Sequence, residues 1–501
     1  MTGTAQVAVG GRARARTWRP SPYAVVGTGF WLLLAVVAWH TPIASDFGQH
    51  ASAVQRVADN PLHPANPLLK EPGNGSPYYS PYIVTLGLTA RLTGAAGWQM
   101  VRWCGPLNLA LLVVGVGAYA RTLSHRRTAP VYALLAFTLL WGPEAKEWSG
   151  FCGVWSLTRG ASYPSTFAVG LAFLLWAWTD RLARRGGTAW EYAGLGAAAG
   201  VLLLVHPITA LAATVGIAAT VAGRQRGWSR EVAGMWAVCG TAAVVVAAAW
   251  PYFDVFALAG DTTVDEVHRR LYIHPWQWYG LAPIGLPALA WRARRRLRDP
   301  LVLMFAADGA IAAYGWFSGH YTYGRVFALL LVPLQFALAV EVAGAPPWTR
   351  LRAVLAPTAA VVLCFALAAQ VGSVVPQRWL PVATPHPQRW PDYAWVADRV
   401  PVGQVVLTDA SIPMHVLPAY GLYLVAPTWP DPSTPAADRD RRWSDMTAYF
   451  APATPAARRT AIARRYGAAW LLLPPGRPAP TPATVVATSP RTGERLLRLS
   501  R

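Results

Sequence analysis

The chain has 501 residues, of which 54% are hydrophobic and only 13% are charged, and its mean hydropathy is +0.29. Soluble globular proteins carry roughly 25% charged residues, so this composition excludes an ordinary soluble protein and indicates a polytopic membrane protein with room for a soluble domain. The formal net charge is +21, but the arginines gather in short loops between apolar segments, where they orient membrane helices. We therefore expect no nucleic acid partner.

Eleven apolar segments are candidates for transmembrane helices, because a helix needs roughly 20 apolar residues to cross the hydrocarbon core of a bilayer. Several of them are shorter than that length. We expect a polytopic α-helical membrane protein with about 11 transmembrane helices, at residues 22–40, 103–121, 130–143, 164–180, 190–205, 207–223, 232–250, 277–291, 300–317, 326–343 and 353–372.

The arginines between these segments predict the orientation of the chain. Cytoplasmic loops carry an excess of Lys and Arg, and a cytoplasmic N-terminus places every arginine-rich loop on that side. An odd number of spans then places the C-terminus outside, so we expect a multi-pass plasma-membrane protein with an extracytoplasmic C-terminal domain. The basic segments are Arg12–Arg19, Arg121–Arg127, Arg181–Arg185, Arg224–Arg230, Arg292–Arg298 and Arg350–Arg352.

The first outer loop, about residues 41–102, opens with Ser45-Asp46-Phe47-Gly48-Gln49-His50. This start has the pattern of an amphipathic helix, because Asp46 and His50 are four residues apart and share one face. The apolar segment Pro81–Thr93 is expected to lie in the membrane interface or to dip into it. The apolar stripe of the amphipathic helix is formed by Phe47, Ala51, Val54 and Ala58.

Asp46 has two interpretations. An acid at a helix start is ordinary, because the helix N-terminus stabilises a carboxylate. Alternatively, Asp46 is a general base that deprotonates an acceptor hydroxyl as the oxygen attacks the anomeric carbon of a sugar. One carboxylate suffices for that reaction when the leaving group is a phosphate, whereas a glycosidase needs a paired acid and base.

Basic side chains of the outer loops are candidates for binding a phosphate. Arg325, in an aromatic and Gly-flanked loop before a predicted span, could hold a lipid phosphate with its planar fork, or could instead reach the lipid headgroups as an interfacial arginine. His320 fits the same pocket, and Arg159 is a second candidate of that kind. His50 could orient Asp46 or contact phosphate, or lie solvated at the surface. His206 could bind substrate, or cap a helix at a tight outer turn.

The composition changes from about residue 373, where apolar runs shorten and Pro, Asp and Arg increase. We expect a transmembrane domain over 1–372 and a small extracytoplasmic α/β domain over 373–501, with helices starting at Thr434-Pro435 and Thr454-Pro455. The four cysteines show no metal-ligand spacing. The expected strands are Gln404–Thr408, Gly421–Ala426, Ala468–Leu473, Ala483–Ala487 and Arg495–Leu499.

This arrangement resembles the GT-C integral-membrane glycosyltransferases, and most nearly the actinobacterial mannosyl- and arabinosyl-transferases. The resemblance lies in the first span, the long outer loop that opens on Asp46, about ten further spans and an outer C-terminal domain. It implies that Asp46 is the catalytic carboxylate and that a late basic residue, here Arg325, binds the donor phosphate. It also implies a polyprenyl-phosphate sugar donor, a glycan, lipid or protein acceptor, and inversion at the anomeric carbon.

Many members of that group carry two adjacent acids in the first loop. Here Phe47 follows Asp46, so we expect neither a metal nor another cofactor. The competing interpretations are a transporter or flippase for lipid-linked cargo and a non-catalytic assembly protein. In a transporter, Asp308 in the middle of a span would be the proton-relay acid, because acids are costly within the membrane, and Asp46 would only cap a helix.

Overall fold

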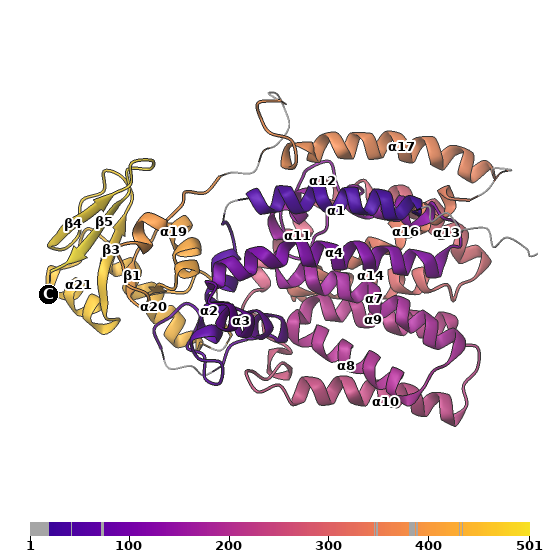
Figure 1. The fold of residues 1–501 in the computed structure, drawn as a ribbon, viewed down its shortest axis with the longest axis horizontal. Coiled ribbons are helices and arrows are strands. Elements are labelled where there is room, and N and C mark those ends of the chain that lie inside the picture. The colour runs from indigo at the N-terminus through magenta and orange to yellow at the C-terminus, as the bar shows by residue number, and fades with distance from the viewer. Residues whose placement is uncertain are drawn as a thin grey trace, which may run out of the picture.

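A computed structural model describes residues 20–500, except positions 42, 72–74, 345, 347–348, 380–385, 387–388, 430 and 433. The basic segment Arg12–Arg19, which contributed to the predicted orientation, lies outside the described residues. The described chain forms a bundle of long helices with a small sheet beyond one end of it (Figure 1).

Seven helices among the described residues are long and apolar enough to span a membrane, which agrees with a multi-pass membrane protein. The predicted number of eleven is not confirmed. One of the seven, Tyr321–Val342, is built from η3 (Tyr321–Val326), α15 (Phe327–Leu330) and α16 (Val332–Val342). The other six correspond to α1 (Pro22–His40), α4 (Gly97–Leu123), α9 (Pro207–Arg224), α10 (Arg230–Ala248), α14 (Pro300–Ser318) and α17 (Arg350–Gln370) with η4 (Val371–Ser373).

The remaining four predicted spans fall on two shorter apolar helices, on one 22-residue helix that is not among the seven, and on an interrupted segment. Three are the helices α5 (Ala129–Leu139), α7 (Pro164–Arg185) and α8 (Ala189–Val205). The segment predicted at 277–291 is broken, since Pro283 and Pro287 lack the amide N–H that an uninterrupted helix requires. Its pieces are α12 (Pro275–Tyr279), η2 (Ala282–Gly285) and α13 (Leu286–Arg295).

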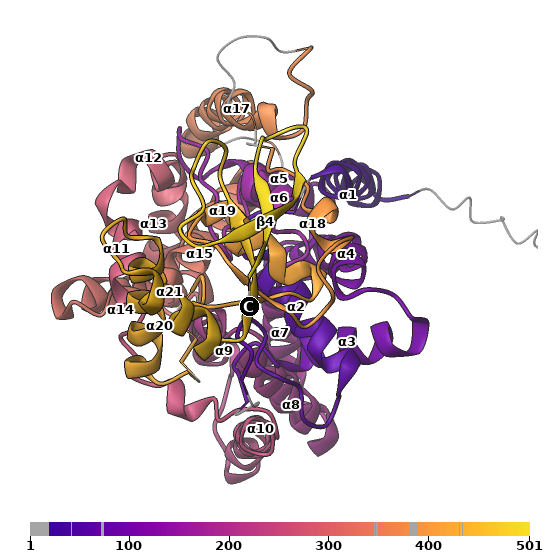
Figure 2. The ribbon, with the colours of Figure 1, turned by 90° about the vertical axis from the view of Figure 1, so that its left-hand side faces the viewer.

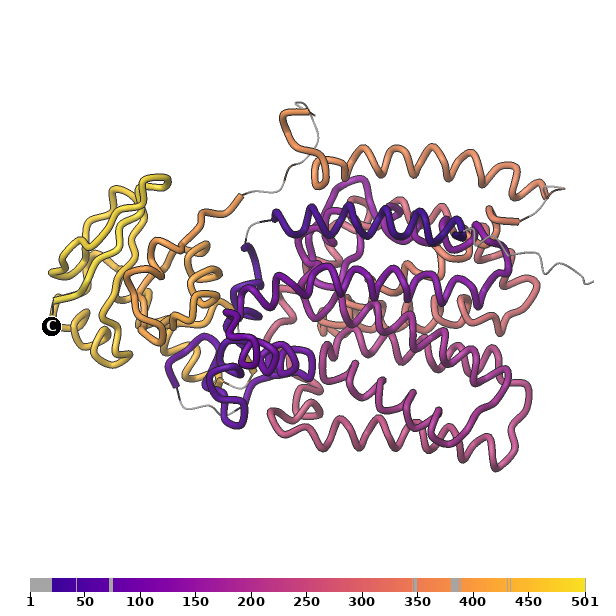
Figure 3. Tube along the Cα trace, in the orientation of Figure 1, coloured from indigo at the N-terminus to yellow at the C-terminus, as the bar shows by residue number. Residues whose placement is uncertain are grey.

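The first outer loop packs against one end of the bundle (Figure 3). Its two main helices, α2 (Phe47–Asp59) and α3 (Pro81–Thr93), coincide with the predicted amphipathic and interfacial segments. The predicted apolar stripe of α2 points inward, because Phe47, Ala51 and Val54 are buried. Later loops contribute α6 (Val154–Gly160), η1 (Phe256–Leu258) and α11 (Asp265–Ile273).

The C-terminal region contains one five-stranded sheet in the order β2-β1-β3-β5-β4. Strand β1 is parallel to both of its neighbours, whereas β5 is antiparallel to both of its own. The five strands lie where the sequence predicted them: β1 (Val405–Leu407), β2 (Tyr423–Leu424), β3 (Ala468–Leu473), β4 (Ala483–Thr488) and β5 (Arg495–Leu499).

Five helical segments accompany this sheet. The two longer ones begin one residue later than predicted, because Pro435 and Pro455 occupy the N-cap position and not the first helical turn. The segments are α18 (Ala394–Ala397), α19 (Ser411–Val416), η5 (Leu417–Tyr420), α20 (Ala436–Phe450) and α21 (Ala456–Arg465).

The C-terminal region lies across the end of the bundle (Figure 2) and is joined to the first outer loop by polar contacts. The amide of Leu424 donates to the carbonyl of Leu68 at 2.9 Å. The guanidinium of Arg56 lies 3.8 Å from the ring centroid of Tyr423. These contacts join residues 56–76 of the first outer loop to the residues that precede α20.

Candidate active site

A cavity of about 430 Å³ opens at the end of the bundle that faces the C-terminal region. Its walls come from four distant parts of the chain: the first outer loop, the loop around α6, the α11–η3 region and the segment after β2. The polar and aromatic side chains that line it include Asp46, Gln49, Tyr78, Lys146, Glu147, Trp148, Tyr163, His268, Arg270, Arg325 and Trp429.

Asp46 stands directly before α2, but its side chain makes no capping hydrogen bond to that helix. The residue before it, Ser45, is the one non-glycine residue with a positive φ, at 50°, among those described. A left-handed conformation is sparsely populated by residues with a side chain, and such residues gather at functional sites. The structure therefore does not support the interpretation of Asp46 as a helix cap.

The carboxyl group of Asp46 is enclosed. Its Oδ1 is buried and has no hydrogen-bond partner among the described residues. Burial raises the pKa of Asp46 above its usual range, while His415, Trp429 and Arg325 act in the opposite direction. A raised pKa makes the carboxylate a stronger proton acceptor, and the positive charge of Arg325 still favours the ionised form that a general base requires.

Arg325 reaches the same cavity from η3, beside a histidine from α11. Its Nη1 lies 3.3 Å from Nε2 of His268, and Nδ1 of His268 lies 3.0 Å from Oγ1 of Thr322. Burial and, to a smaller extent, the positive charge of Arg325 lower the pKa of His268 to about 3, so the imidazole is neutral. Because a guanidinium only donates, Nε2 accepts from Arg325, and Nδ1–H donates to Thr322. His268 thus orients Arg325.

The loop that precedes α6 adds two charged side chains to the cavity. Oε2 of Glu147 lies 2.5 Å from Nε of Arg159. Burial raises the pKa of Glu147, whereas Arg159 lowers it. The ammonium of Lys146 lies 4.6 Å from the ring centroid of Trp278, and no carboxylate pairs with it among the residues that the structure describes. Lys146 is therefore available to an anionic ligand.

Four of the predicted phosphate-binding residues do not line the cavity. His50 packs against the rings of Tyr78 and Tyr163, at centroid distances of 6.0 and 5.3 Å, and burial lowers its pKa to about 4. A neutral, enclosed imidazole is not a solvated surface histidine. The other three residues have partners elsewhere.

His320 does not share the pocket of Arg325, since its Nδ1 lies 3.4 Å from Asp265 and its side chain is 42% exposed. Nδ1 of His206 accepts the amide of Thr209 at 3.3 Å and so caps α9, which was one of its two interpretations. Arg159 reaches the site only through Glu147. Sequence reasoning therefore placed Asp46 and Arg325 in the cavity but gave no role to Lys146, Glu147, His268 or Trp429.

Among the described residues, no group of three His, Cys, Asp or Glu side chains is arranged to hold a metal ion. The four cysteines are free thiols.

Neither a family model nor a curated protein matches this sequence, but solved structures do. Arabinofuranosyltransferase AftD from Mycobacteria matches with a TM-score of 0.55 and 16% identity over 96% of this chain and 40% of that chain. ArnT from Cupriavidus metallidurans, bound to undecaprenyl phosphate, matches with a TM-score of 0.52 and 15% identity over 95% of this chain and 98% of that chain.

This chain has the GT-C fold. A mutant form of AftD gives a TM-score of 0.61 at 16% identity. The chain spans about 40% of the length of AftD but nearly the whole length of ArnT. The predicted fold class, a polytopic helical membrane protein with a small C-terminal α/β region, is confirmed apart from the number of spans.

Proposed function

We propose that the chain is an inverting glycosyltransferase that moves a sugar from a polyprenyl-phosphate donor to a glycan, lipid or protein acceptor of the cell envelope. The observation that carries this proposal is the meeting of Asp46 and Arg325 in one cavity at the end of a membrane-spanning bundle. The cavity thus offers a base to the acceptor and a phosphate-binding cation to the donor. ArnT, of similar fold, has been solved with undecaprenyl phosphate bound.

In the proposed reaction, the carboxylate of Asp46 takes the proton of the acceptor hydroxyl as that oxygen attacks the anomeric carbon. The new glycosidic bond forms on the face opposite the bond to the phosphate oxygen, which breaks. The electron pair of that bond leaves with the polyprenyl phosphate. Arg325 and Lys146 stabilise the negative charge that grows on the phosphate, so no acid is needed to protonate the leaving group.

We also propose the predicted orientation and domain division: an N-terminus in the cytoplasm, a membrane domain over 1–372 and an extracytoplasmic domain over 373–501. Six arginines from the ends of four helices line one cavity at the end of the bundle away from the candidate active site. Because cytoplasmic ends are enriched in Lys and Arg, this observation supports an outer position for Asp46 and the sheet.

Transfer from radiolabelled polyprenyl-phosphate sugars, measured in membranes that contain the chain, tests the proposal. Wild type should form a labelled product. Asp46→Asn should reduce the rate of transfer about 10²- to 10⁴-fold, because an Asn side chain has the size of Asp but cannot act as a base. The control is Asp59→Asn, at the other end of α2 and outside the cavity. Normal turnover by Asp46→Asn would show that the carboxylate is structural.

One observation favours the transporter alternative enough to test it. Both carboxyl oxygens of Asp308, within α14, are buried without a hydrogen-bond partner among the described residues. A proton-relay acid should be indispensable, so Asp308→Asn would abolish transport of lipid-linked cargo. The transferase proposal instead expects near-normal sugar transfer from Asp308→Asn, because the residue is not among those that line the cavity.

A further inference from the structure

A second cavity, of about 520 Å³, lies at the opposite end of the bundle, where α4, α7, α9 and α13 end. Its lining is strongly basic. It includes His125 and one acid, Asp180, and six arginines from four segments: Arg121, Arg181, Arg184, Arg185, Arg224 and Arg292.

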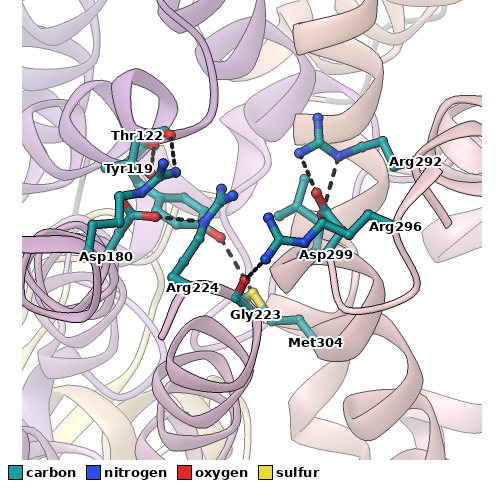
Figure 4. A network of polar contacts seen from close by, with 11 residues as sticks. Tyr119, Thr122, Asp180, Gly223, Arg224, Arg292, Arg296, Asp299 and Met304 are labelled. Atoms are coloured by element: carbon teal, nitrogen blue, oxygen red, sulfur yellow. Dashed lines mark hydrogen bonds and ion pairs between the residues drawn. The ribbon is translucent and has the colours of Figure 1, made fainter. Parts of the chain in front are cut away.

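The inner wall of this cavity is a fixed ion-pair network (Figure 4). Asp180, which is only 6% exposed, accepts from Nε of Arg184 at 2.8 Å and from Nε of Arg224 at 2.9 Å. On the neighbouring helix, Arg292 pairs with Asp299 at 2.7 Å. Buried charges in such networks need their partners, so these groups hold the wall in place.

The carboxylates around this cavity do not neutralise the positive charge of its arginines. Asp180, Asp299 and Glu191, which pairs with Arg181 at 2.9 Å, are the acids that contact the six guanidinium groups of this cavity among the described residues. Three acids therefore face six cations. Arg121 and Arg185 are exposed and form no ion pair within the described chain. Arg121 instead lies over the ring of Tyr23, at 5.4 Å.

We propose that this cavity binds the phosphate of an anionic lipid headgroup. It combines a rigid inner wall, an accessible mouth and surplus positive charge, and basic pockets between membrane helices recognise such headgroups. It lies where the membrane-spanning helices α4 and α9 end, so headgroup phosphates are the anions nearest to it. Arginine suits this ligand because its planar fork can donate two parallel hydrogen bonds to phosphate.

The test uses the purified full-length chain in detergent, titrated with cardiolipin or with phosphatidylcholine, with bound lipid counted by native mass spectrometry. The Arg121→Gln/Arg185→Gln variant removes two unpaired cations and leaves the ion-pair network intact. We expect cardiolipin to bind to it at least about tenfold more weakly, because each lost guanidinium removes a charge-assisted contact to the bound phosphate. Phosphatidylcholine should bind weakly to every form.

The matched control is Arg294→Gln/Arg298→Gln, which removes the same charge from exposed arginines at the same end that do not line the cavity. It should retain near-normal cardiolipin binding. Equal losses in the two double variants would overturn the proposal, because they would indicate only general attraction to the basic surface. If the cavity variant does not fold, the single change Arg185→Gln should still weaken binding more than Arg298→Gln.

Inorganic phosphate separates a lipid from a soluble ligand. Millimolar phosphate should leave cardiolipin binding unchanged if the lipid is the ligand. Displacement of cardiolipin by phosphate, with phosphate bound in its place, would overturn the assignment to a lipid. The proposal is independent of the transfer reaction, since Asp46→Asn should bind cardiolipin normally even where it loses transfer.

Discussion

At Asp46, burial and charge act in opposite directions on one carboxyl group: burial raises its pKa, and His415, Trp429 and Arg325 lower it. A general base must be unprotonated, so transfer should be lost as the pH falls through this pKa. Because the pKa is raised, that loss should begin at a higher pH than an ordinary aspartate would give, whose pKa is about 4.

The loss of activity at low pH forms the acid limb of the pH profile. Removing the positive charge of Arg325 should move this limb to still higher pH, since Arg325 is among the groups that lower the pKa of Asp46. The measurement is kcat/KM against pH for wild type and Arg325→Gln, which reports the free enzyme. Arg298→Gln, a distant exposed arginine, should leave the limb in place. A limb that does not move in Arg325→Gln would contradict the coupling between the two residues.

Arg325 itself is expected to contact the donor phosphate. Arg325→Lys keeps the charge but loses the planar fork, so it should weaken use of the donor, and Arg325→Ala should weaken it further, by roughly 10- to 100-fold, as for the loss of a hydrogen bond to a charged group. Both KM and kcat should change, because negative charge grows on the phosphate during transfer.

Titration of the lipid donor against these variants measures that effect. Arg269→Ala is the control, because Arg269 lies on α11 but does not line the cavity. If wild type and Arg325→Ala gave the same donor curve, the phosphate would have to lie elsewhere in the cavity, at Lys146 or Arg270.

At the scale of elements, helix α2 connects the candidate base to the C-terminal region. Gly48 lies two residues after Asp46, and a Cβ atom there would overlap the carbonyl oxygen of His415, in α19. The absence of a side chain thus lets α19 pack directly on the first turn of α2. Through this contact, the C-terminal region helps to define the position of Asp46.

Gly48→Ala should therefore push α19 away from α2, at a cost of about 1–3 kcal/mol for overpacking, and lower transfer activity at the same time. Thermal unfolding of the purified protein and the rate of sugar transfer measure the two effects. The control is Gly240→Ala in α10, where a Cβ would meet no atom within 4 Å. If the two variants unfolded at the same temperature, the close approach of α19 to α2 would not matter.

At the scale of the whole molecule, the two ends of the bundle differ in charge and in the cavity that each carries. One end carries the candidate active site and the sheet, and the other carries the basic cavity. A reporter enzyme that is active only outside the cytoplasm, fused after Arg501, should be active. A fusion after Arg226, in the basic loop between α9 and α10, should be inactive. The reverse pattern would place Asp46 in the cytoplasm and rule out transfer on the outer side.

The sequence by itself determined the class of protein and most of its local structure. Hydropathy, helical periodicity and alternation are local properties, so the amphipathic start of the first loop, the interfacial helix at Pro81–Thr93 and the five strands were all predicted near their observed positions. The interruption of the segment 277–291 was not predicted, because the average hydropathy of a window of residues does not indicate where prolines divide a helix.

Only the tertiary structure decided which side chains share the cavity. Asp46 and Arg325 were singled out from their loops, but Lys146, Glu147, His268 and Trp429 come from other segments and carry no motif. Conversely, His320 lies five residues before Arg325 but turns to Asp265. Closeness along the chain does not determine closeness in space, because the packing of α2, α11 and the C-terminal region sets which loop side chains meet and how deeply each is buried.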